Sequence, residues 1–335
     1  REGFKQTKGQ FFTHINIVRF LLFALQLDKL AIEKVNKDLE IPYIIDPSAG
    51  SGTFLIEYMK FITEILKRRF KDRLNQTRDL EDKFQEWFLP DNRENKWAKH
   101  YIYGVEHNFN LGTAMKVNMI LHGDGSSNIF VKDGLLPFSF YNKAAAPNAL
   151  NKAEKDSVYY DKEVNGEFDC IVSNPPFSVD LDRETKETLK KSFIFCYEKK
   201  SENLFIERYY QLLKENGRLG VVLPESIFDT TENKYIRLFI YKYFKVKAVV
   251  SLPQLTFSPF TSTKTSLLFA QKKTKKEVEE WTNIWNKYSN EWGTLKTRCE
   301  NLLKVYIDSK DRSKLPSIQN LSINEESKIL NRLLK

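Results

Sequence analysis

The sequence predicts an α/β fold built on a doubly wound sheet of seven, mostly parallel strands. Short apolar runs, each typical of a buried strand, alternate with longer segments in which apolar residues recur at helical spacing. Four of the expected strands lead into a polar residue, in chain order Asp46, Glu106, Asp133 and Asn174. Because open α/β sheets bind ligands at the carboxyl ends of their parallel strands, these side chains predict a binding site at that edge.

Length and composition indicate a globular chain. It has 335 residues, 41% of them hydrophobic, and its net charge of +9 is compatible with nucleic acid as a partner. The three cysteines lack CxxC spacing and the four histidines lack HxxxH spacing, so we expect neither a disulfide framework nor a metal site. No apolar run approaches the roughly 20 residues of a membrane span, and no signal peptide is recognisable, so we expect a cytoplasmic protein without a membrane partner. The chain begins at Arg1 rather than Met, which indicates a piece of a longer polypeptide.

The N-terminal part predicts one long amphipathic helix over residues 15–37, because apolar side chains recur there at helical spacing. Thr13 stands where an N-cap is expected. The preceding Phe11 and Phe12 are read equally well as a hydrophobic staple or as part of a functional motif that begins at Gln10.

A loop of small residues follows the first strand, which ends at Asp46 and Pro47. The loop contains Gly50 and Gly52 and leads into a helix that extends to about residue 71. Glycines let a backbone approach a ligand closely, and the helix N-terminus offers free N–H groups. The pattern is not GxGxxG, and no Lys-Ser/Thr pair completes a phosphate loop, so it argues against nicotinamide and ATP sites.

Two later strands end at carboxylates that suit a nucleoside. Glu106 can accept hydrogen bonds from both ribose hydroxyls, and Asp133 from an adenine amine. Asp124, in a glycine-flanked stretch that resembles a turn, competes with Asp133 for that role. Residues 71–100 predict a helical surface insertion, solvated or in contact with a partner, which lengthens the spacing between the glycine loop and Glu106.

The fourth strand, predicted from the apolar run Cys170–Val172, ends at a stiff loop, Asn174-Pro175-Pro176-Phe177. Proline has no N–H and a fixed φ, so strand and helix both stop there. Asn174 offers a neutral carboxamide and Phe177 a ring on which a flat group can stack.

The rest of the chain completes the sheet and then changes character. We expect a loop over 138–166, helices over 204–213 and 235–244, and strands over 218–223, 246–252 and 265–271, with residues 215–217 ending the first of these helices. These define a catalytic domain over residues 1–274. A helical extension over 275–335, with three tryptophans and a last amphipathic helix over 323–334, is expected to serve in docking.

Together and in this order, these motifs resemble the amino-group DNA methyltransferases, and within them most the adenine-specific modification (M) subunit of type I restriction-modification systems. The resemblance extends over residues 9–271 and implies the class I S-adenosylmethionine-dependent methyltransferase fold with S-adenosyl-L-methionine as cofactor. One departure is His14, where the family usually has Pro. The cofactor-binding residues that it implies are Gln10, Phe11, Phe12, Thr13, Asp46, Ser48, Ala49, Gly50, Ser51, Gly52, Thr53, Glu106 and Asp133.

The resemblance also implies a reaction and partners. Asn174, Pro175, Pro176 and Phe177 would act on the amino group of a flipped-out adenine in double-stranded DNA. A separate specificity (S) subunit, and further a restriction (R) subunit, are the expected partners, since no segment looks like a domain that reads sequence. Family members usually carry a helical N-terminal domain, which we expect to be missing from this chain.

Other substrates and another class of function remain open at this point. Asn-Pro-Pro-aromatic loops also occur in methyltransferases of a protein glutamine amide and of guanine amines in ribosomal RNA. The motif at residues 10–13 disfavours both, and a cytosine amino methyltransferase usually has Ser in place of Asn174. A catalytically silent scaffold that binds DNA or a partner is the alternative from a different class.

Overall fold

The computed structural model describes residues 12–69, 71–88, 95–123, 128–141, 148–155, 158–177, 187, 189–196, 200–309 and 328. The chain divides into two compact units, residues 1–275 and 276–335, and each is described here by itself. Gln10, Phe11 and Asp124 lie outside the described residues, as does all but one residue of the helix predicted over 323–334.

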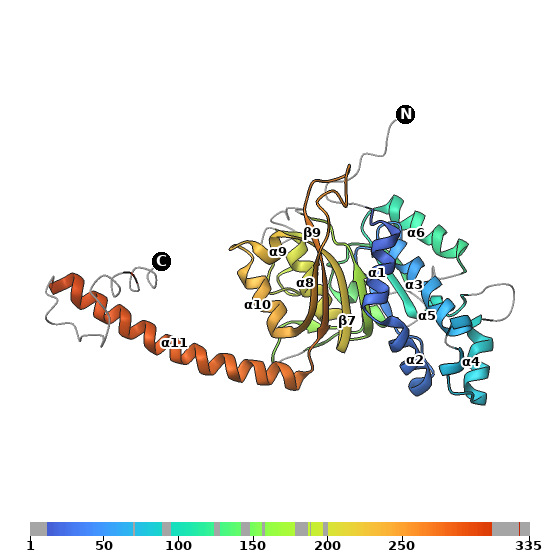
Figure 1. The fold of residues 1–335 in the computed structure, drawn as a ribbon, viewed down its shortest axis with the longest axis horizontal. Coiled ribbons are helices and arrows are strands. Elements are labelled where there is room, and N and C mark those ends of the chain that lie inside the picture. The colour runs from blue at the N-terminus through green and yellow to red at the C-terminus, as the bar shows by residue number, and fades with distance from the viewer. Residues whose placement is uncertain are drawn as a thin grey trace. The chain divides into compact units, whose positions relative to one another are not determined.

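The first unit is built on a seven-stranded sheet in the order β3-β2-β1-β6-β7-β9-β8 (Figure 1). The strands are β1 (Ile44–Asp46), β2 (Ile102–Glu106), β3 (Ile129–Val131), β6 (Phe168–Ser173), β7 (Leu213–Pro224), β8 (Phe244–Ser251) and β9 (Thr265–Lys272). All neighbouring pairs are parallel except those of β9, which is antiparallel to both β7 and β8. The predicted doubly wound, mostly parallel sheet is therefore confirmed.

Helices cover both faces of this sheet. Figure 1 shows α1, α3 and α6 on one side and α8, α9 and α10 on the other. Their bounds are α1 (Ile15–Ala24), α2 (Leu27–Asp38), α3 (Thr53–Glu64), α4 (Arg78–Phe88), α5 (Ala98–Tyr101), α6 (Phe109–Leu121), α8 (Ser201–Leu212), α9 (Ser226–Asp229) and α10 (Lys234–Tyr243), with a π-helical turn at Ile65–Arg69 and a 3₁₀ turn at Lys71–Arg73. Because both faces are covered, the central strands consist almost entirely of buried residues.

The single helix predicted over 15–37 is in fact two, α1 and α2. Gln26 adopts a left-handed backbone (φ 54°) between them, and Leu25 on one side and Leu27 on the other are both buried. A Cβ added to Gly220 of β7 would come within 2.7 Å of Leu25, so the missing side chain there leaves room for the end of α1. The N-cap of α1 is His14 rather than Thr13, because its side chain accepts a hydrogen bond from the N–H of Asn16 (3.2 Å).

We had expected segment 71–100 to be a surface insertion, but three of its aromatic residues are buried. Trp87, Phe88 and Trp97 are at most 5% exposed and belong to the main hydrophobic core. Trp97 also donates a hydrogen bond to the hydroxyl of Thr63 in α3 (3.2 Å). Since α4 carries an apolar face inward, this segment extends the core instead of standing on the surface.

The remaining differences are local. The predicted loop over 138–166 contains two 3₁₀ turns (Phe138–Tyr141 and Ala149–Asn151) and a small antiparallel ribbon, β4 (Glu154–Lys155) with β5 (Glu163–Val164). Residues 215–217 do not end α8 but lie in β7, which bulges there: Phe168 pairs with Leu213 and Cys170 with Arg218.

The second unit contains α11, which begins at Lys275 and extends to Ser309. The rings of Trp281 and Trp285, one helical turn apart, stack with their centroids 5.1 Å apart. Within the described ranges of the chain, no helix is long and apolar enough to cross a membrane.

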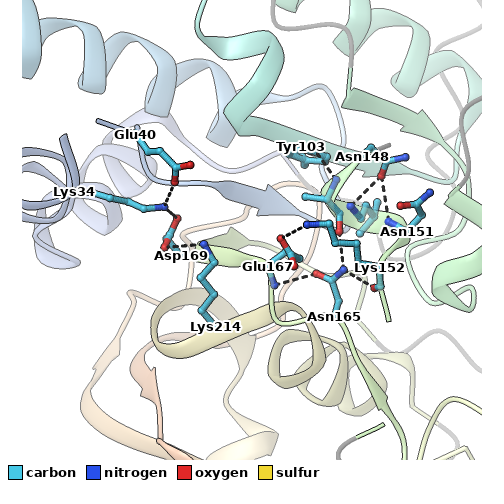
Figure 2. A network of polar contacts seen from close by, with 12 residues as sticks. Lys34, Glu40, Tyr103, Asn148, Asn151, Lys152, Asn165, Glu167, Asp169 and Lys214 are labelled. Atoms are coloured by element: carbon cyan, nitrogen blue, oxygen red, sulfur yellow. Dashed lines mark hydrogen bonds and ion pairs between the residues drawn. The ribbon is translucent and has the colours of Figure 1, made fainter. Parts of the chain in front are cut away.

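A buried ion cluster fastens α2 to the strand that leads to Asn174. Asp169 of β6 accepts hydrogen bonds from the ammonium of Lys34 (2.6 Å) and from the N–H of Tyr43 (2.8 Å), and Lys214 lies 3.5 Å from its second oxygen. Figure 2 shows Asp169 between the two lysines, and Glu40 on the opposite side of the Lys34 ammonium from Asp169. The side chains of Lys34 and Asp169 are only 10% and 13% exposed, so solvent screens the pair weakly.

We expect Lys34→Met to lower the free energy of unfolding by roughly 3 kcal/mol, since removing one partner leaves a buried carboxylate poorly compensated. Removing one partner of a buried ion pair typically costs about 3–5 kcal/mol, and we expect the lower end of this range because Lys214 remains beside Asp169. Urea unfolding measures it, with Lys83→Met as control because Lys83 and Glu86 form an ion pair at the surface. A loss as small as that of the control would show that the cluster contributes little.

Candidate active site

The ends of three adjacent strands bring the predicted site residues to one edge of the sheet. β2, β1 and β6 are neighbours, so Glu106, Asp46 and Asn174, which follows β6, lie at the same carboxyl edge. The loop between Asp46 and α3 crosses this edge. The structure therefore assembles a continuous set of polar groups from segments more than 120 residues apart.

The glycine loop is held by β2 and keeps one side open. Gly50 and Gly52 both have left-handed backbones (φ 55° and 87°), which favour glycine. The N–H of Ala49 donates to the carbonyl of Val105 (2.9 Å), and that of Gly50 to the carboxylate of Glu106 (2.8 Å). A Cβ on Gly52 would lie 2.8 Å from Met115, whereas one on Gly50 would meet nothing within 4 Å in the described part of the chain. The loop thus has room for a ligand above Gly50.

The other small residues of the loop support its shape. Gly52 is the N-cap residue of α3, which begins at Thr53. The hydroxyls of Ser51 and Thr53 are 3.3 Å apart, and the carbonyl of Ser51 accepts from the side chain of Asn118 (3.3 Å).

The carboxylate of Glu106 is 3% exposed and fixed by two backbone N–H groups. One oxygen accepts from Gly50 and the other from Asn108 (2.7 Å). These two bonds, one to each oxygen, fix the orientation of the carboxylate at the end of β2.

Asp46 is buried and connects the glycine loop to the loop that contains Asn174. Its carboxylate accepts from the hydroxyl of Ser173 (2.6 Å) and the N–H of Ser48 (3.0 Å), and the two serine hydroxyls are 2.8 Å apart. Burial raises the pKa of Asp46 to about 7, although the hydrogen bonds from Ser173 and Ser48 act in the opposite direction.

We had not included Ser173 among the predicted site residues. The sequence signal that could have identified it is a serine at the end of a buried strand, directly before Asn174.

The carboxamide of Asn174 is held at one end only. Its nitrogen donates to the hydroxyl of Thr13 (3.0 Å), while its buried oxygen accepts no hydrogen bond from any residue that the structure describes. A buried acceptor without a partner is costly, which makes this oxygen the natural place for an N–H group of a ligand.

The two ends of the proline loop are packed. The carbonyl of Pro176 accepts from the hydroxyl of Ser201 at the start of α8 (3.2 Å). The ring of Phe177 is 4% exposed and belongs to the main core, together with Phe257 from the segment between β8 and β9. Pro175 lies between Asn174 and this anchored end.

Aromatic rings stand beside this loop. Phe12 is 50% exposed, and its ring centroid lies 6.3 Å from that of Phe260, in an edge-to-face arrangement. Phe260 belongs to the segment between β8 and β9, whose ends also lie at the carboxyl edge. We had not singled out Phe260, because nothing in the sequence shows that its segment returns to this edge.

Asp133 lies two residues beyond β3, in a turn next to the glycine loop. Its side chain accepts from the N–H of Leu135 (2.9 Å), and its carbonyl accepts from the hydroxyl of Tyr141 (2.6 Å). A Cβ on Gly134 would lie 2.0 Å from the carbonyl oxygen of Pro47, so only glycine permits this close approach. The structure therefore places Asp133 beside the loop that begins at Asp46.

The site offers acceptors rather than metal ligands. In the ranges that the structure describes, no three His, Cys, Asp or Glu side chains form a group that could hold a metal ion. Cys170, directly inside the strand that ends at Ser173, is fully buried, and burial raises the pKa of its thiol. The open glycine loop, the doubly fixed Glu106 and the unpartnered Asn174 oxygen fit a nucleoside cofactor beside an amine-bearing substrate.

Comparison with solved structures agrees with this geometry. A Listeria monocytogenes protein assigned to the class I S-adenosylmethionine-dependent methyltransferases is 18% identical, with a TM-score of 0.50, and the match covers 82% of this chain and 64% of that one. The EcoKI M protein of a type I restriction enzyme is 19% identical, with a TM-score of 0.51, over 82% of this chain and 46% of that one. These likenesses show that the chain shares the fold of these proteins.

The sequence relationship is more specific. The family model described as N-6 DNA Methylase matches residues 2–314, and the chain belongs to this family. It is similar to the methylase subunit of the type I restriction enzyme EcoEI from Escherichia coli, with 25% identity over 266 residues that cover 79% of this chain and 42% of that subunit. The chain thus spans less than half the length of that relative. S-adenosyl-L-methionine is the methyl donor of this family and fold, as the sequence indicated.

The raised pKa of Asp46 has a consequence for stability. The pKa of Asp46 is about 7 in the folded chain and near 4 in the unfolded chain. The contribution of protonated Asp46 to the free energy of unfolding is therefore complete below pH 4 and is lost as the pH rises to about 7. Relative to Asp46→Asn, the wild-type free energy of unfolding should therefore fall by an amount on the order of a few kcal/mol between pH 4 and pH 8. Urea unfolding across this range, with the exposed Asp38→Asn as control, measures the difference; parallel curves for wild type and Asp46→Asn would refute the shift.

Proposed function

We propose that this chain is the catalytic part of a site-specific DNA adenine-N6 methyltransferase that acts as the modification subunit of a restriction-modification system. One observation carries the proposal: the buried oxygen of Asn174 has no partner among the described residues and stands at the sheet edge beside the glycine loop. Membership of the N-6 DNA methylase family supports adenine as the base.

The proposed mechanism starts from the weakness of an adenine amine as a nucleophile, because its lone pair is delocalised into the ring. The oxygen of Asn174 and the carbonyl of Pro175 accept its two N–H groups and favour a pyramidal nitrogen with a localised lone pair. These acceptors interact most strongly as the nitrogen becomes positive, so they stabilise the transition state more than the ground state. S-adenosyl-L-methionine, when bound, supplies an electrophilic methyl group. As the N–C bond forms, the bond between that methyl group and the sulfonium sulfur would break and leave a neutral thioether, and the amine would then lose an N–H proton to solvent.

Positioning is the second contribution of the chain. Pro176 and Phe177 are fixed by Ser201 and by the core, so the loop presents Asn174 from a rigid support. We assign to Phe177 the wall of the pocket against which the base lies. The base has to leave the duplex to reach it, at a cost of a few kcal/mol.

The cofactor is proposed to lie across the three strand ends. The glycine loop from Ser48 to Thr53 holds the methionine part, Glu106 the ribose hydroxyls, and Asp133 the adenine amine. Thr13 and Phe12 contribute from the N-terminal motif to which Gln10 and Phe11 belong. The room above Gly50 and the two N–H groups that orient Glu106 support this arrangement.

Double-stranded DNA is the proposed substrate, in the cytoplasm, and the net charge of +9 suits a polyanion. We further propose a specificity (S) subunit as partner, since site selection needs a sequence-reading element, and a restriction (R) subunit as an additional one. α11 is the element that we propose for docking, because Trp285 and Trp292 are about half exposed on it.

We expect Asn174→Ala to reduce methyl transfer to duplex DNA by on the order of 10²-fold or more, by analogy with the loss of one transition-state hydrogen bond. Binding of S-adenosyl-L-methionine should be retained, because the glycine loop and Glu106 are untouched. Transfer of a labelled methyl group and calorimetric titration measure the two effects.

Asn151→Ala is the matched control. Asn151 precedes Lys152, which pairs with Glu167 directly before β6 (Figure 2), at the end of that strand away from Asn174. Normal turnover by Asn174→Ala would contradict the role of the carboxamide. Cofactor binding without any methylation of DNA by the wild type, assayed together with the specificity subunit proposed above, would instead favour another amine substrate, such as a protein glutamine amide or a guanine in ribosomal RNA, or a silent scaffold.

Thr13→Val removes the acceptor that holds the nitrogen of Asn174 and leaves the carboxamide free to rotate. We expect kcat to fall about tenfold, which corresponds to a single hydrogen bond of about 1.4 kcal/mol. Thr13→Ser keeps the hydroxyl and should restore kcat. An unchanged kcat in Thr13→Val would show that this bond does not orient Asn174.

A further inference from the structure

Two neighbouring charged residues of α8 are fully buried and take no part in the mechanism above. Glu207 and Arg208 are 0% and 1% exposed, in a helix of which all twelve residues are buried. Successive helical residues point about 100° apart, so the two side chains reach different segments. Burying charged groups is expensive unless each is well held, so what they hold is informative.

Arg208 holds the turn that contains Asp133. Its guanidinium donates to the carbonyls of Leu135 (2.9 Å) and Leu136 (2.8 Å). It is clamped between the rings of Phe138 and Phe193, with its central carbon 4.5 and 4.7 Å from their centroids. A planar guanidinium suits both tasks at once, because it donates in its plane and stacks through its faces.

This turn has little freedom to settle elsewhere. The carboxylate of Asp133 accepts from the N–H of Leu135, so the residue whose carbonyl Arg208 holds also orients the carboxylate. On the other side, a Cβ on Gly134 would lie 2.0 Å from the carbonyl oxygen of Pro47 and 3.4 Å from the ring of Phe205 in α8, so the turn fits closely against both. A displacement of Arg208 would therefore move Asp133 relative to the glycine loop.

Glu207 holds a different segment. Its carboxylate accepts from the N–H groups of Ile194 (2.6 Å) and Phe195 (3.0 Å) and from the hydroxyl of Tyr160 (2.5 Å). Gln211, one turn further along α8, donates to the same hydroxyl and to the carbonyl of Ser192. Glu207 and Arg208 thus hold different segments, and only Arg208 contacts the turn that contains Asp133.

We propose that Arg208 is a positioning residue for cofactor binding: by holding the carbonyls of Leu135 and Leu136, it sets the turn that presents Asp133 to the adenine of S-adenosyl-L-methionine. The inference rests on the proposed function for the role of Asp133. It adds that the affinity for the cofactor is determined in part from α8, the helix that also anchors Pro176 through Ser201.

The test is a double-mutant cycle on cofactor affinity, measured by calorimetric titration of the full chain with S-adenosyl-L-methionine without DNA. Arg208→Met and Asp133→Ala should each raise the dissociation constant about tenfold, and the double variant should bind no more weakly than the weaker single variant. Such non-additivity is expected when one residue acts through the other. A product of the two effects, about a hundredfold, would overturn the proposal.

The chain offers a matched control for a merely structural role. Lys272 is also buried, donates to two backbone carbonyls, of Tyr210 (2.8 Å) and Leu213 (2.7 Å), and lies over an aromatic ring, but it holds the junction of α8 and β7 and not the turn of Asp133. Lys272→Met should lower the thermal midpoint and leave the dissociation constant within about twofold of wild type. An equal loss of affinity in Lys272→Met and Arg208→Met would mean that Arg208 only supports the fold.

Further variants separate the possible failures. Arg208→Lys keeps the charge and a donor but not the flat face that lies over Phe138 and Phe193, so it should show a smaller loss of affinity. It is the variant to titrate if Arg208→Met does not fold. If neither folds, amide exchange of the wild type is the second measurement: cofactor binding should slow exchange at residues 134–138, and unchanged exchange would overturn the proposal. Wild-type affinity in Asp133→Ala would refute the role of Asp133 and this inference with it. Failure of the wild type to methylate DNA in the presence of the proposed specificity subunit would refute the proposed function alone.

Discussion

The hydrogen bond from Ser173 to the buried carboxylate of Asp46 is the contact on which the rest of the site depends. It joins the ends of β6 and β1, and these neighbouring strands carry the two loops that have to meet. With Ser48 as the third member, the glycine loop and the Asn174 loop share one small polar network inside an apolar surrounding. In such surroundings a satisfied network is rigid, because each broken bond leaves an unpaired buried group.

The remaining loops are fixed to this centre by backbone groups. Glu106 orders the glycine loop through Gly50, the Asp133 turn packs on Pro47, and Ser201 anchors Pro176. Helix α8 reaches both of the outer segments, since Arg208 faces the Asp133 turn and Glu207 faces residues 194–195. Two features thus support the site: helix α8, and the hydrogen-bond network of Asp46, Ser48 and Ser173.

The sequence predicted the parts of this arrangement that are local. Strand ends at Asp46, Glu106 and Asn174 could be recognised because a short apolar run and a following polar residue are adjacent in the chain. The break at Gln26 could not, since it depends on Gly220, nearly 200 residues away, leaving room for Leu25. The same holds for the buried aromatic residues of α4 and for Arg208: both look like surface positions until the fold places apolar neighbours around them.

The carboxamide of Asn174 shows how stability and function oppose each other at this edge. Its nitrogen is satisfied by Thr13, but its oxygen is buried without a described partner, at an expected cost of about 1–3 kcal/mol. A fold selected for stability alone would turn the group or add a donor. A turn would place the oxygen on the Thr13 hydroxyl and leave the nitrogen without that partner. The prolines that follow lack N–H groups and cannot supply another donor. No donor among the described residues reaches this oxygen, so in the proposed reaction an incoming exocyclic amine would satisfy it, at the edge where the glycine loop has room for a cofactor.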